Sequence, residues 1–122
     1  MLLLQHSKCS TCLNARNWLN FHKFSYTSRD IIQDNPTYEE LSEWHKKSEL
    51  PIKRLFNTSG ILYKSMGLKD KLSYMSDEEC FKLLSTDGML VKRPILVWDD
   101  KVLVGFKVDI WREIFKTEEK SI

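Results

Sequence analysis

Hydrophobic and polar positions along the first thirty residues predict a strand, a helix and a second strand. Residues 1–5 form a short apolar run, which is typical of a buried strand. Residues 10–22 then repeat apolar side chains at helical spacing, with Trp18 widening the apolar face. Residues 24–30 carry aromatic and β-branched side chains, which favour a strand. We expect this second strand to lie parallel to the first, because a helix connects the two.

The middle of the chain, residues 37–88, predicts a helical insert. Thr37 and Ser76 are each followed three residues later by glutamate, which is the spacing of a capping box at a helix start. Apolar residues at helical spacing follow each box, and Pro51 begins a further short helix. The expected helices cover residues 37–48, 51–56, about 62–66 and 76–84.

The last third of the chain predicts a hairpin and a final helix. Two apolar runs, residues 95–98 and 101–104, flank the acidic pair Asp99-Asp100, as in an antiparallel hairpin. We expect Asp109 to cap the last helix. The order β-α-β, helical insert, β-β-α predicts an α/β protein with the thioredoxin-like fold and a mixed sheet. We expect residues 1–122 to form a single domain.

Composition narrows the class of protein further. The net charge is only +2, with 19 basic and 17 acidic side chains interspersed, so charge alone does not favour nucleic-acid binding. No apolar stretch approaches the length of a membrane span. The three cysteines are too few for a disulfide framework and fit a reducing compartment. We therefore expect a cytoplasmic monomer that contacts neither nucleic acid nor membrane directly.

Cys9 and Cys12 are the strongest candidates for chemistry. They follow the first strand and open the first helix, where the positive helix N-terminus stabilises a thiolate. Nearby positive charge, from Lys8 or from a residue brought in by the fold, would lower the pKa of Cys9 further. A metal site would need more ligands, such as His6 and Cys80, at spacings that the sequence does not provide. The pattern favours a redox pair over a metal site or two inert thiols.

Arg93 and Pro94 form the second informative pair. A proline that starts a central strand offers no amide to the ladder, and a cis peptide bond facing the dithiol explains its position. Arg93, held extended by the proline, would then project its charge toward Cys9. The alternative is an edge-strand proline beside a solvated arginine. His6 is either a base or hydrogen-bond donor near the thiol, or an exposed loop histidine.

Five motifs, in order along nearly the whole chain, resemble the arsenate reductase/Spx family of thioredoxin-like proteins. The resemblance is greatest to the small uncharacterised arsenate reductase-like branch of Gram-positive bacteria. It implies a thioredoxin fold with a helical insert, a cytosolic location and a catalytic or redox-sensing Cys9. The motifs are Cys9 to Leu19, Phe56 to Gly60 with Tyr63, Asp87 to Leu90, Lys92 to Ile95, and Val104 to Phe106.

The resemblance also separates the branches of the family. The family's nucleophilic cysteine falls on Cys9 and the arginine of its Arg-Pro motif on Arg93, while Cys12 matches the Spx-type dithiol. Arsenate reductases of the family hold their oxyanion with three arginines. Two of these positions fall near Asn57 and near residues 106–107, where this chain has no arginine. A glycine that Spx needs in the insert aligns with proline at position 51.

These features predict a thiol–disulfide oxidoreductase of the arsenate reductase-like family. Cys9 attacks, Cys12 resolves, Arg93 stabilises negative charge and Pro94 positions the partner, while Asn57 is a further candidate. We expect no prosthetic group or metal. The expected partners are a small thiol such as glutathione, or a redoxin such as glutaredoxin or thioredoxin. The alternatives are a Spx-like redox-sensing regulator that binds the RNA polymerase α-subunit, and a glutathione/glutaredoxin-coupled arsenate reductase.

Overall fold

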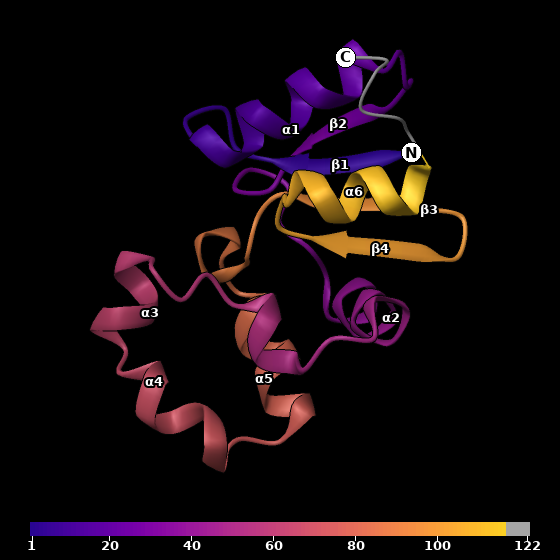
Figure 1. Cartoon of the computed structure of the whole chain (residues 1–122). Coiled ribbons are helices and arrows are strands. Elements are labelled where there is room, and N and C mark those ends of the chain that lie inside the picture. The colour runs from indigo at the N-terminus through magenta and orange to yellow at the C-terminus, as the bar shows by residue number, and fades with distance from the viewer. Residues whose placement is uncertain (117–122) are drawn as a thin grey trace.

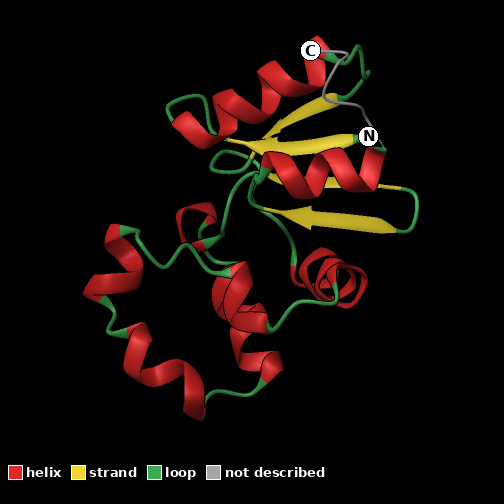
Figure 2. Cartoon of the chain, viewed as in Figure 1, coloured by secondary structure: helices red, strands yellow, loops and turns green. Residues whose placement is uncertain are grey.

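A four-stranded mixed sheet forms the centre of the protein, as a computed structural model that describes residues 1–116 shows (Figures 1 and 2). The strand order is β2-β1-β3-β4, with β1 parallel to β2 and the other two pairings antiparallel. This arrangement confirms the thioredoxin-like topology predicted from the order of elements. The strands are β1 (Leu2–Gln5), β2 (Thr27–Asp30), β3 (Ile95–Trp98) and β4 (Lys101–Val104).

Helices α1 (Ser10–Phe21) and α6 (Val108–Phe115) cover one face of the sheet. Leu3 on β1 and its partner Leu96 on β3 point toward these helices and are fully buried. Trp18 of α1 and Trp111 of α6 meet above them edge to face, with ring centroids 5.7 Å apart. Aromatic pairs in this geometry add to the free energy of burial, so the pair fixes α1 against α6.

The helical insert covers the opposite face. Leu4 and Ile95, next to Leu3 and Leu96 in sequence, point to this face because side chains alternate along a strand. They pack in one core with Leu41 and Trp44 of α2 (Tyr38–Ser48). The insert continues through η1 (Ile52–Leu55), α3 (Ile61–Ser65), α4 (Leu68–Lys71), η2 (Leu72–Tyr74), α5 (Asp77–Leu84) and η3 (Gly88–Leu90).

Both predicted capping boxes are present. The Thr37 hydroxyl accepts from the Glu40 amide at 3.1 Å, and the Glu40 carboxylate accepts from the Thr37 amide at 3.0 Å. Ser76 and Glu79 repeat this exchange at the start of α5. Glu40 also receives two hydrogen bonds from Arg29, at 2.7 and 2.9 Å. This bidentate pair ties the end of β2 to the first turn of α2.

The structure corrects three details of the expected elements. β2 begins at Thr27 rather than at Phe24, because pairing with β1 begins at Thr27 opposite Leu2, while the Phe24 amide donates to the Leu19 carbonyl at 2.9 Å. Residues 68–74 are helical, although the sequence pattern did not predict a helix there. Asp109 is not the cap of the last helix: α6 begins one residue earlier, and Asp109 accepts from Arg112 at 3.3 Å within its first turns.

Gly88 joins the end of the insert to the end of β2, and a side chain there would disrupt this contact. A Cβ at position 88 would lie 1.8 Å from the backbone oxygen of Ile31. We expect Gly88→Ala to lower the free energy of unfolding by about 1–3 kcal/mol, because two buried backbone segments must separate. Urea denaturation measures the change, and the exposed Ser73→Ala provides the surface control. Equal midpoints for the two variants would contradict this contact.

Candidate functional site

Cys9 and Cys12 lie at the N-terminus of α1, one helical turn apart. Cys9 is the N-cap residue, and its sulfur accepts a hydrogen bond from the Cys12 amide at 3.4 Å. A sulfur at this position interacts with the positive end of the helix dipole. Both residues are free thiols; Cys9 is partly exposed and Cys12 is fully buried. The predicted strand-to-helix placement of the dithiol is therefore correct, and only Cys9 is accessible to a reagent.

Arg93 supplies the positive charge beside Cys9. Because Leu4 pairs with Ile95, the loop after β1 and the residues before β3 lie at the same end of the sheet. The Arg93 guanidinium is within hydrogen-bonding reach of the Cys9 sulfur, and the Arg93–Pro94 peptide bond is cis. The Nε and Nη1 atoms of Arg93 are buried without a partner in the described part of the chain. Arg93 thus has donors left over for a second group.

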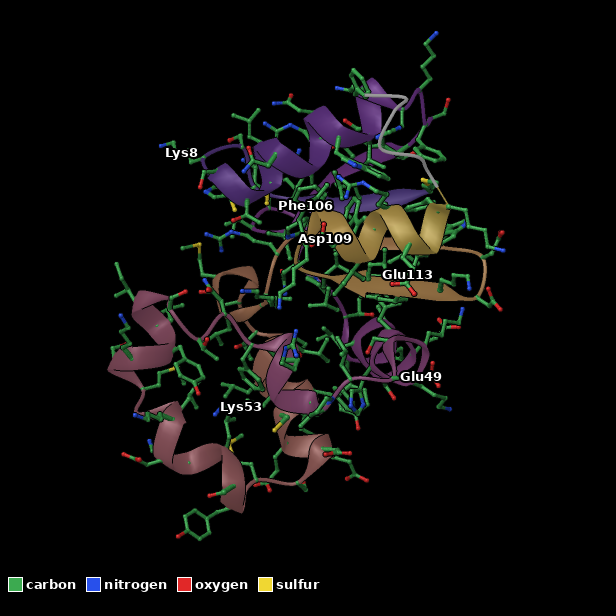
Figure 3. The ribbon with its side chains drawn as sticks, viewed as in Figure 1. Lys8, Glu49, Lys53, Phe106, Asp109 and Glu113 are labelled. Carbon is green, nitrogen blue, oxygen red and sulfur yellow. The ribbon has the colours of Figure 1, made fainter. Side chains whose placement is uncertain are left out.

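The surroundings of Cys9 favour its thiolate. Burial opposes ionisation, but it is outweighed by hydrogen bonds from the Cys12 thiol and amide and by the hydrogen bond and charge of Arg93. Together they hold the pKa of Cys9 below its usual range. Lys8 is not among these causes, and Figure 3 shows its side chain extending away from the body of the protein. The expected nearby charge thus comes from Arg93.

Cys12 has the opposite character. Burial, together with the hydrogen bond and charge of the neighbouring Cys9, raises the pKa of Cys12 to about 12, although the His6 amide and the charge of Arg93 oppose this shift. Cys12 therefore keeps its proton at neutral pH and donates it in a hydrogen bond to Cys9. The site contains one reactive thiolate and one protonated thiol held in reserve.

A cavity of about 350 Å³ opens beside Cys9, which places the reactive sulfur in a pocket large enough for a small ligand. Arg93 and Lys92 contribute positive charge to the cavity, and Asn57 and Ser59 of the insert contribute polar groups. Its remaining lining residues are Thr11, Gly60, Ile61 and Met89.

The other predicted site residues occupy distinct positions. Asn57 lines the cavity, and its amide group donates to the Met89 carbonyl at 3.5 Å. Pro94 is buried, and its carbonyl accepts from the Gly105 amide at 2.7 Å. His6 touches the dithiol through its backbone, because its carbonyl accepts from the Cys9 amide at 3.1 Å. Its imidazole Nδ1 is buried without a partner among residues 1–116.

Cys80 lies apart from the dithiol. It is fully buried in the core between the sheet and the insert, and it belongs to α5. Residues 1–116 contain no group of three or more His, Cys, Asp or Glu side chains arranged to hold a metal ion. Within the same residues, no helix is long and apolar enough to cross a membrane.

Thr11 and Lys92 are lining residues that the sequence analysis did not assign to the site. Thr11 lies between the two cysteines on the first turn of α1, and Lys92 precedes Arg93. Both residues stand inside motifs that carry the family resemblance, Cys9 to Leu19 and Lys92 to Ile95, but neither was given a role there. Whether their side chains face the cavity depends on how α1 and the approach to β3 are oriented, which only the structure provides.

Comparisons with known proteins identify the family. The family model of the ArsC family matches residues 4–114. The chain belongs to the ArsC family. It is 44% identical to the uncharacterised protein YusI of Bacillus subtilis, over 88% of this chain and 92% of YusI. It is 23% identical to the global transcriptional regulator Spx of Staphylococcus epidermidis, over 88% of this chain and 80% of Spx.

A solved structure agrees with this assignment. An ArsC-family-related protein of Bacteroides fragilis superposes with a TM-score of 0.90 and is 50% identical, covering 93% of this chain and 95% of that chain. These matches confirm the resemblance drawn from the five sequence motifs. They also place this chain in a family that includes both arsenate reductase-like proteins and Spx regulators.

The charge of Arg93 makes a measurable contribution to the reactivity of Cys9. The alkylation rate of Cys9 rises with pH because the thiolate is the reacting form. We expect the midpoint of this rise, which reports the pKa of Cys9, to lie below the ordinary thiol value of roughly 8.5. Arg93→Gln removes a hydrogen bond and a positive charge, so the midpoint moves to higher pH. Iodoacetamide labelling followed by mass spectrometry measures the midpoint for each variant.

Lys8→Gln is the matched control, because it removes the same charge from a neighbour that does not face the sulfur. We expect its midpoint to coincide with that of the unaltered protein. A midpoint that moves as far in Lys8→Gln as in Arg93→Gln would show that the effect reflects net charge rather than contact.

Proposed function

We propose that this ArsC-family protein is a thiol–disulfide oxidoreductase with Cys9 as its nucleophile. The observation that carries the proposal is the contrast between the two thiols: Cys9 has a lowered pKa and faces a cavity, whereas Cys12 is buried and protonated. Such a contrast assigns attack to one sulfur and resolution to the other.

In the first step the Cys9 thiolate attacks one sulfur of a substrate disulfide. A Cys9–substrate mixed disulfide forms, the substrate S–S bond breaks, and one substrate thiolate leaves. Arg93 lies beside this exchange, where its charge stabilises the attacking and departing thiolates.

In the second step Cys12 attacks the Cys9 sulfur. Once Cys9 is part of a disulfide, it carries no charge, so both of its effects on the Cys12 pKa, the charge and the hydrogen bond to the thiolate, disappear. Arg93 and the His6 amide still favour the Cys12 thiolate. Cys12 passes its proton to the first leaving thiolate and expels the second. Two electrons have then moved from the dithiol to the substrate, and a thiol reductant such as glutathione or a redoxin restores the pair.

The assay that tests this proposal follows the reduction of bis(2-hydroxyethyl) disulfide, a small neutral disulfide, by the reduced protein. We expect Cys9→Ser to abolish the exchange, because the remaining thiols are buried. Cys12→Ser should still attack but stop at the mixed disulfide, which mass spectrometry detects as an adduct on Cys9. Cys80→Ser is the control and is expected to retain turnover. Turnover in Cys9→Ser would refute the assignment.

A regulatory function is the second candidate, because the Spx relatives are named global transcriptional regulators. A dithiol of the kind described here is also a redox switch in chemical terms, since oxidation joins Cys9 to Cys12. If the protein is such a regulator, we expect it to bind the RNA polymerase α-subunit with an affinity that differs between its reduced and oxidised forms. Calorimetric titration with the purified α-subunit measures this, and absence of binding in both states removes the candidate.

The site supports arsenate reduction less well than disulfide exchange. Arg93 is the only arginine that lines the Cys9 cavity in the described part of the chain. A doubly charged oxyanion needs several charge-assisted donors, and among the described lining residues Arg93 is joined by Lys92, a single point charge, and by the neutral Asn57 and Ser59. We therefore rank arsenate below disulfides as the substrate class.

A further inference from the structure

Within residues 1–116, β4 is an edge strand and no other strand lies on its outer side. In an antiparallel pair, opposite residues alternate between hydrogen-bonded and non-bonded positions. The Gly105 amide donates to the Pro94 carbonyl at 2.7 Å, so these two residues form a hydrogen-bonded pair. Because the two kinds of pair alternate, Val104 opposite Ile95 and Val102 opposite Val97 occupy non-bonded positions. Their N–H and C=O groups point away from β3. Val104 is half-buried, so its backbone groups can pair with an added strand, whereas Val102 is only 4% exposed and packs in the core with Leu41 and Trp44 of α2.

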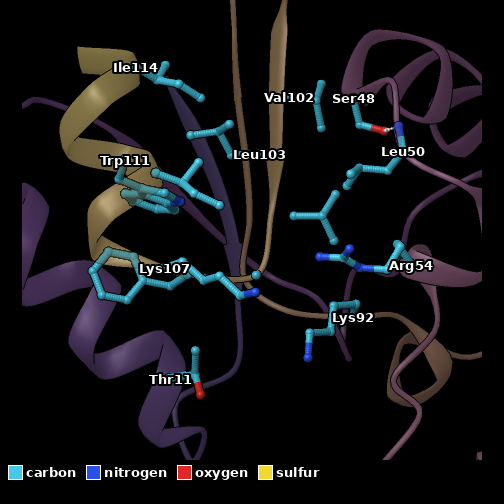
Figure 4. Close-up of a pocket in the computed structure, with 14 residues that line it drawn as sticks. Thr11, Ser48, Leu50, Arg54, Lys92, Val102, Leu103, Lys107, Trp111 and Ile114 are labelled. Carbon is cyan, nitrogen blue, oxygen red and sulfur yellow. Dashed lines mark hydrogen bonds between the residues drawn. The ribbon is translucent and has the colours of Figure 1, made fainter. Parts of the chain in front are cut away.

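A groove of about 530 Å³ runs along this edge and is called the β4 groove below. It is lined by residues from both faces of β4, such as Val102 and Leu103, which is expected of a groove that follows the strand's edge. Figure 4 shows α6 residues Trp111 and Ile114 on one side of the strand and Leu50 with Arg54 on the other.

The charge of the β4 groove is of one sign. Arg54, Lys92 and Lys107 line it, and no acidic side chain does so in the part of the chain that the structure describes. Arg54 and Lys107 approach the gap from opposite walls, as Figure 4 shows. Between them the walls are apolar. The groove therefore fits an extended chain that alternates acidic and apolar side chains.

The β4 groove leads directly to the reactive thiol. Thr11 and Lys92 line both the groove and the Cys9 cavity, so the two spaces adjoin. The bond between Gly105 and Pro94 also places the end of β4 next to the Arg93–Pro94 segment. A chain that pairs with β4 therefore ends beside Cys9.

We propose that the β4 groove binds an extended acidic segment of a partner protein by strand addition, with a cysteine of that segment presented to Cys9. This inference rests on the proposed oxidoreductase function and specifies its substrate class as a protein disulfide. Main-chain bonds to Val104 supply affinity, and Arg54 and Lys107 select acidic side chains. Cys9 attacks the segment's disulfide sulfur, forms the mixed disulfide and releases the other sulfur as a thiolate.

The experiment uses a short peptide of alternating glutamate and valine with one terminal cysteine, carried as a mixed disulfide with pyridine-2-thiol. Its reaction with Cys9 releases pyridine-2-thione, whose absorbance gives the rate in the Cys12→Ser protein. We expect this peptide to react about tenfold faster at low ionic strength than a peptide with lysine for glutamate. N-methylation of alternate peptide amides should remove much of the advantage, because it blocks strand pairing.

The paired variant Arg54→Gln/Lys107→Gln tests the charges of the groove. We expect it to lose most of the preference for the acidic peptide. The control Lys69→Gln/Lys71→Gln removes the same charge from exposed residues of α4 and should keep the preference. Equal rates for acidic and basic peptides, or loss of preference in both paired variants, would overturn the proposal. Indifference to N-methylation would favour a small anionic thiol over a protein segment and would also overturn it.

Two measurements separate this inference from the proposed function. Reaction of Cys9 with bis(2-hydroxyethyl) disulfide reports the thiol chemistry alone. Binding of the acidic peptide with serine in place of cysteine, followed by amide NMR signals, reports docking alone. We expect the Val104 amide signal to shift and the amide to become protected from exchange. An unchanged Val104 signal would overturn strand addition even if Cys9 is fully reactive.

Discussion

The antiparallel pairing of β1 with β3 is the constraint on which the candidate site depends. It places the end of β1 opposite the start of β3, so Cys9 and Arg93 meet although 83 residues separate them in the sequence. Leu4 and Ile95 form the last pair before the site, and both are fully buried. The register cannot slip by one residue without exposing this face of the strands. Core packing on both faces of the sheet therefore fixes the geometry of the thiol and the guanidinium.

That geometry creates a difference between two chemically identical thiols. Cys9 is at the helix cap, partly exposed and in reach of Arg93, whereas Cys12 is turned inward and loses more from burial. Each thiol also acts on the other, because the Cys12 proton stabilises the Cys9 charge and that charge raises the Cys12 pKa. The pair is thus coupled: a change in the bonding of one sulfur changes the acidity of the other.

Local signals in the sequence predicted much of the fold. Features that depend on tertiary contacts could not be predicted from such signals. The capping boxes at Thr37 and Ser76 and the hairpin depend on neighbours in sequence and were confirmed. The start of β2 was misplaced because it depends on the pairing with β1, whose register begins with Leu2 opposite Thr27. Likewise, the dithiol was visible as a motif, but the identity of its cation was open between Lys8 and a distant residue. Only the sheet register selects Arg93.

The positive charges around the site differ in how strongly solvent screens them. Arg93 is partly buried, with two of its nitrogens inaccessible, so dissolved salt weakens its interaction with Cys9 little. Arg54 and Lys107 are exposed on the walls of the β4 groove, where salt screens them strongly. If the groove selects acidic segments, selection and chemistry therefore depend on separate charges. Salt therefore changes the pKa of the nucleophile less than it changes the preference among partners.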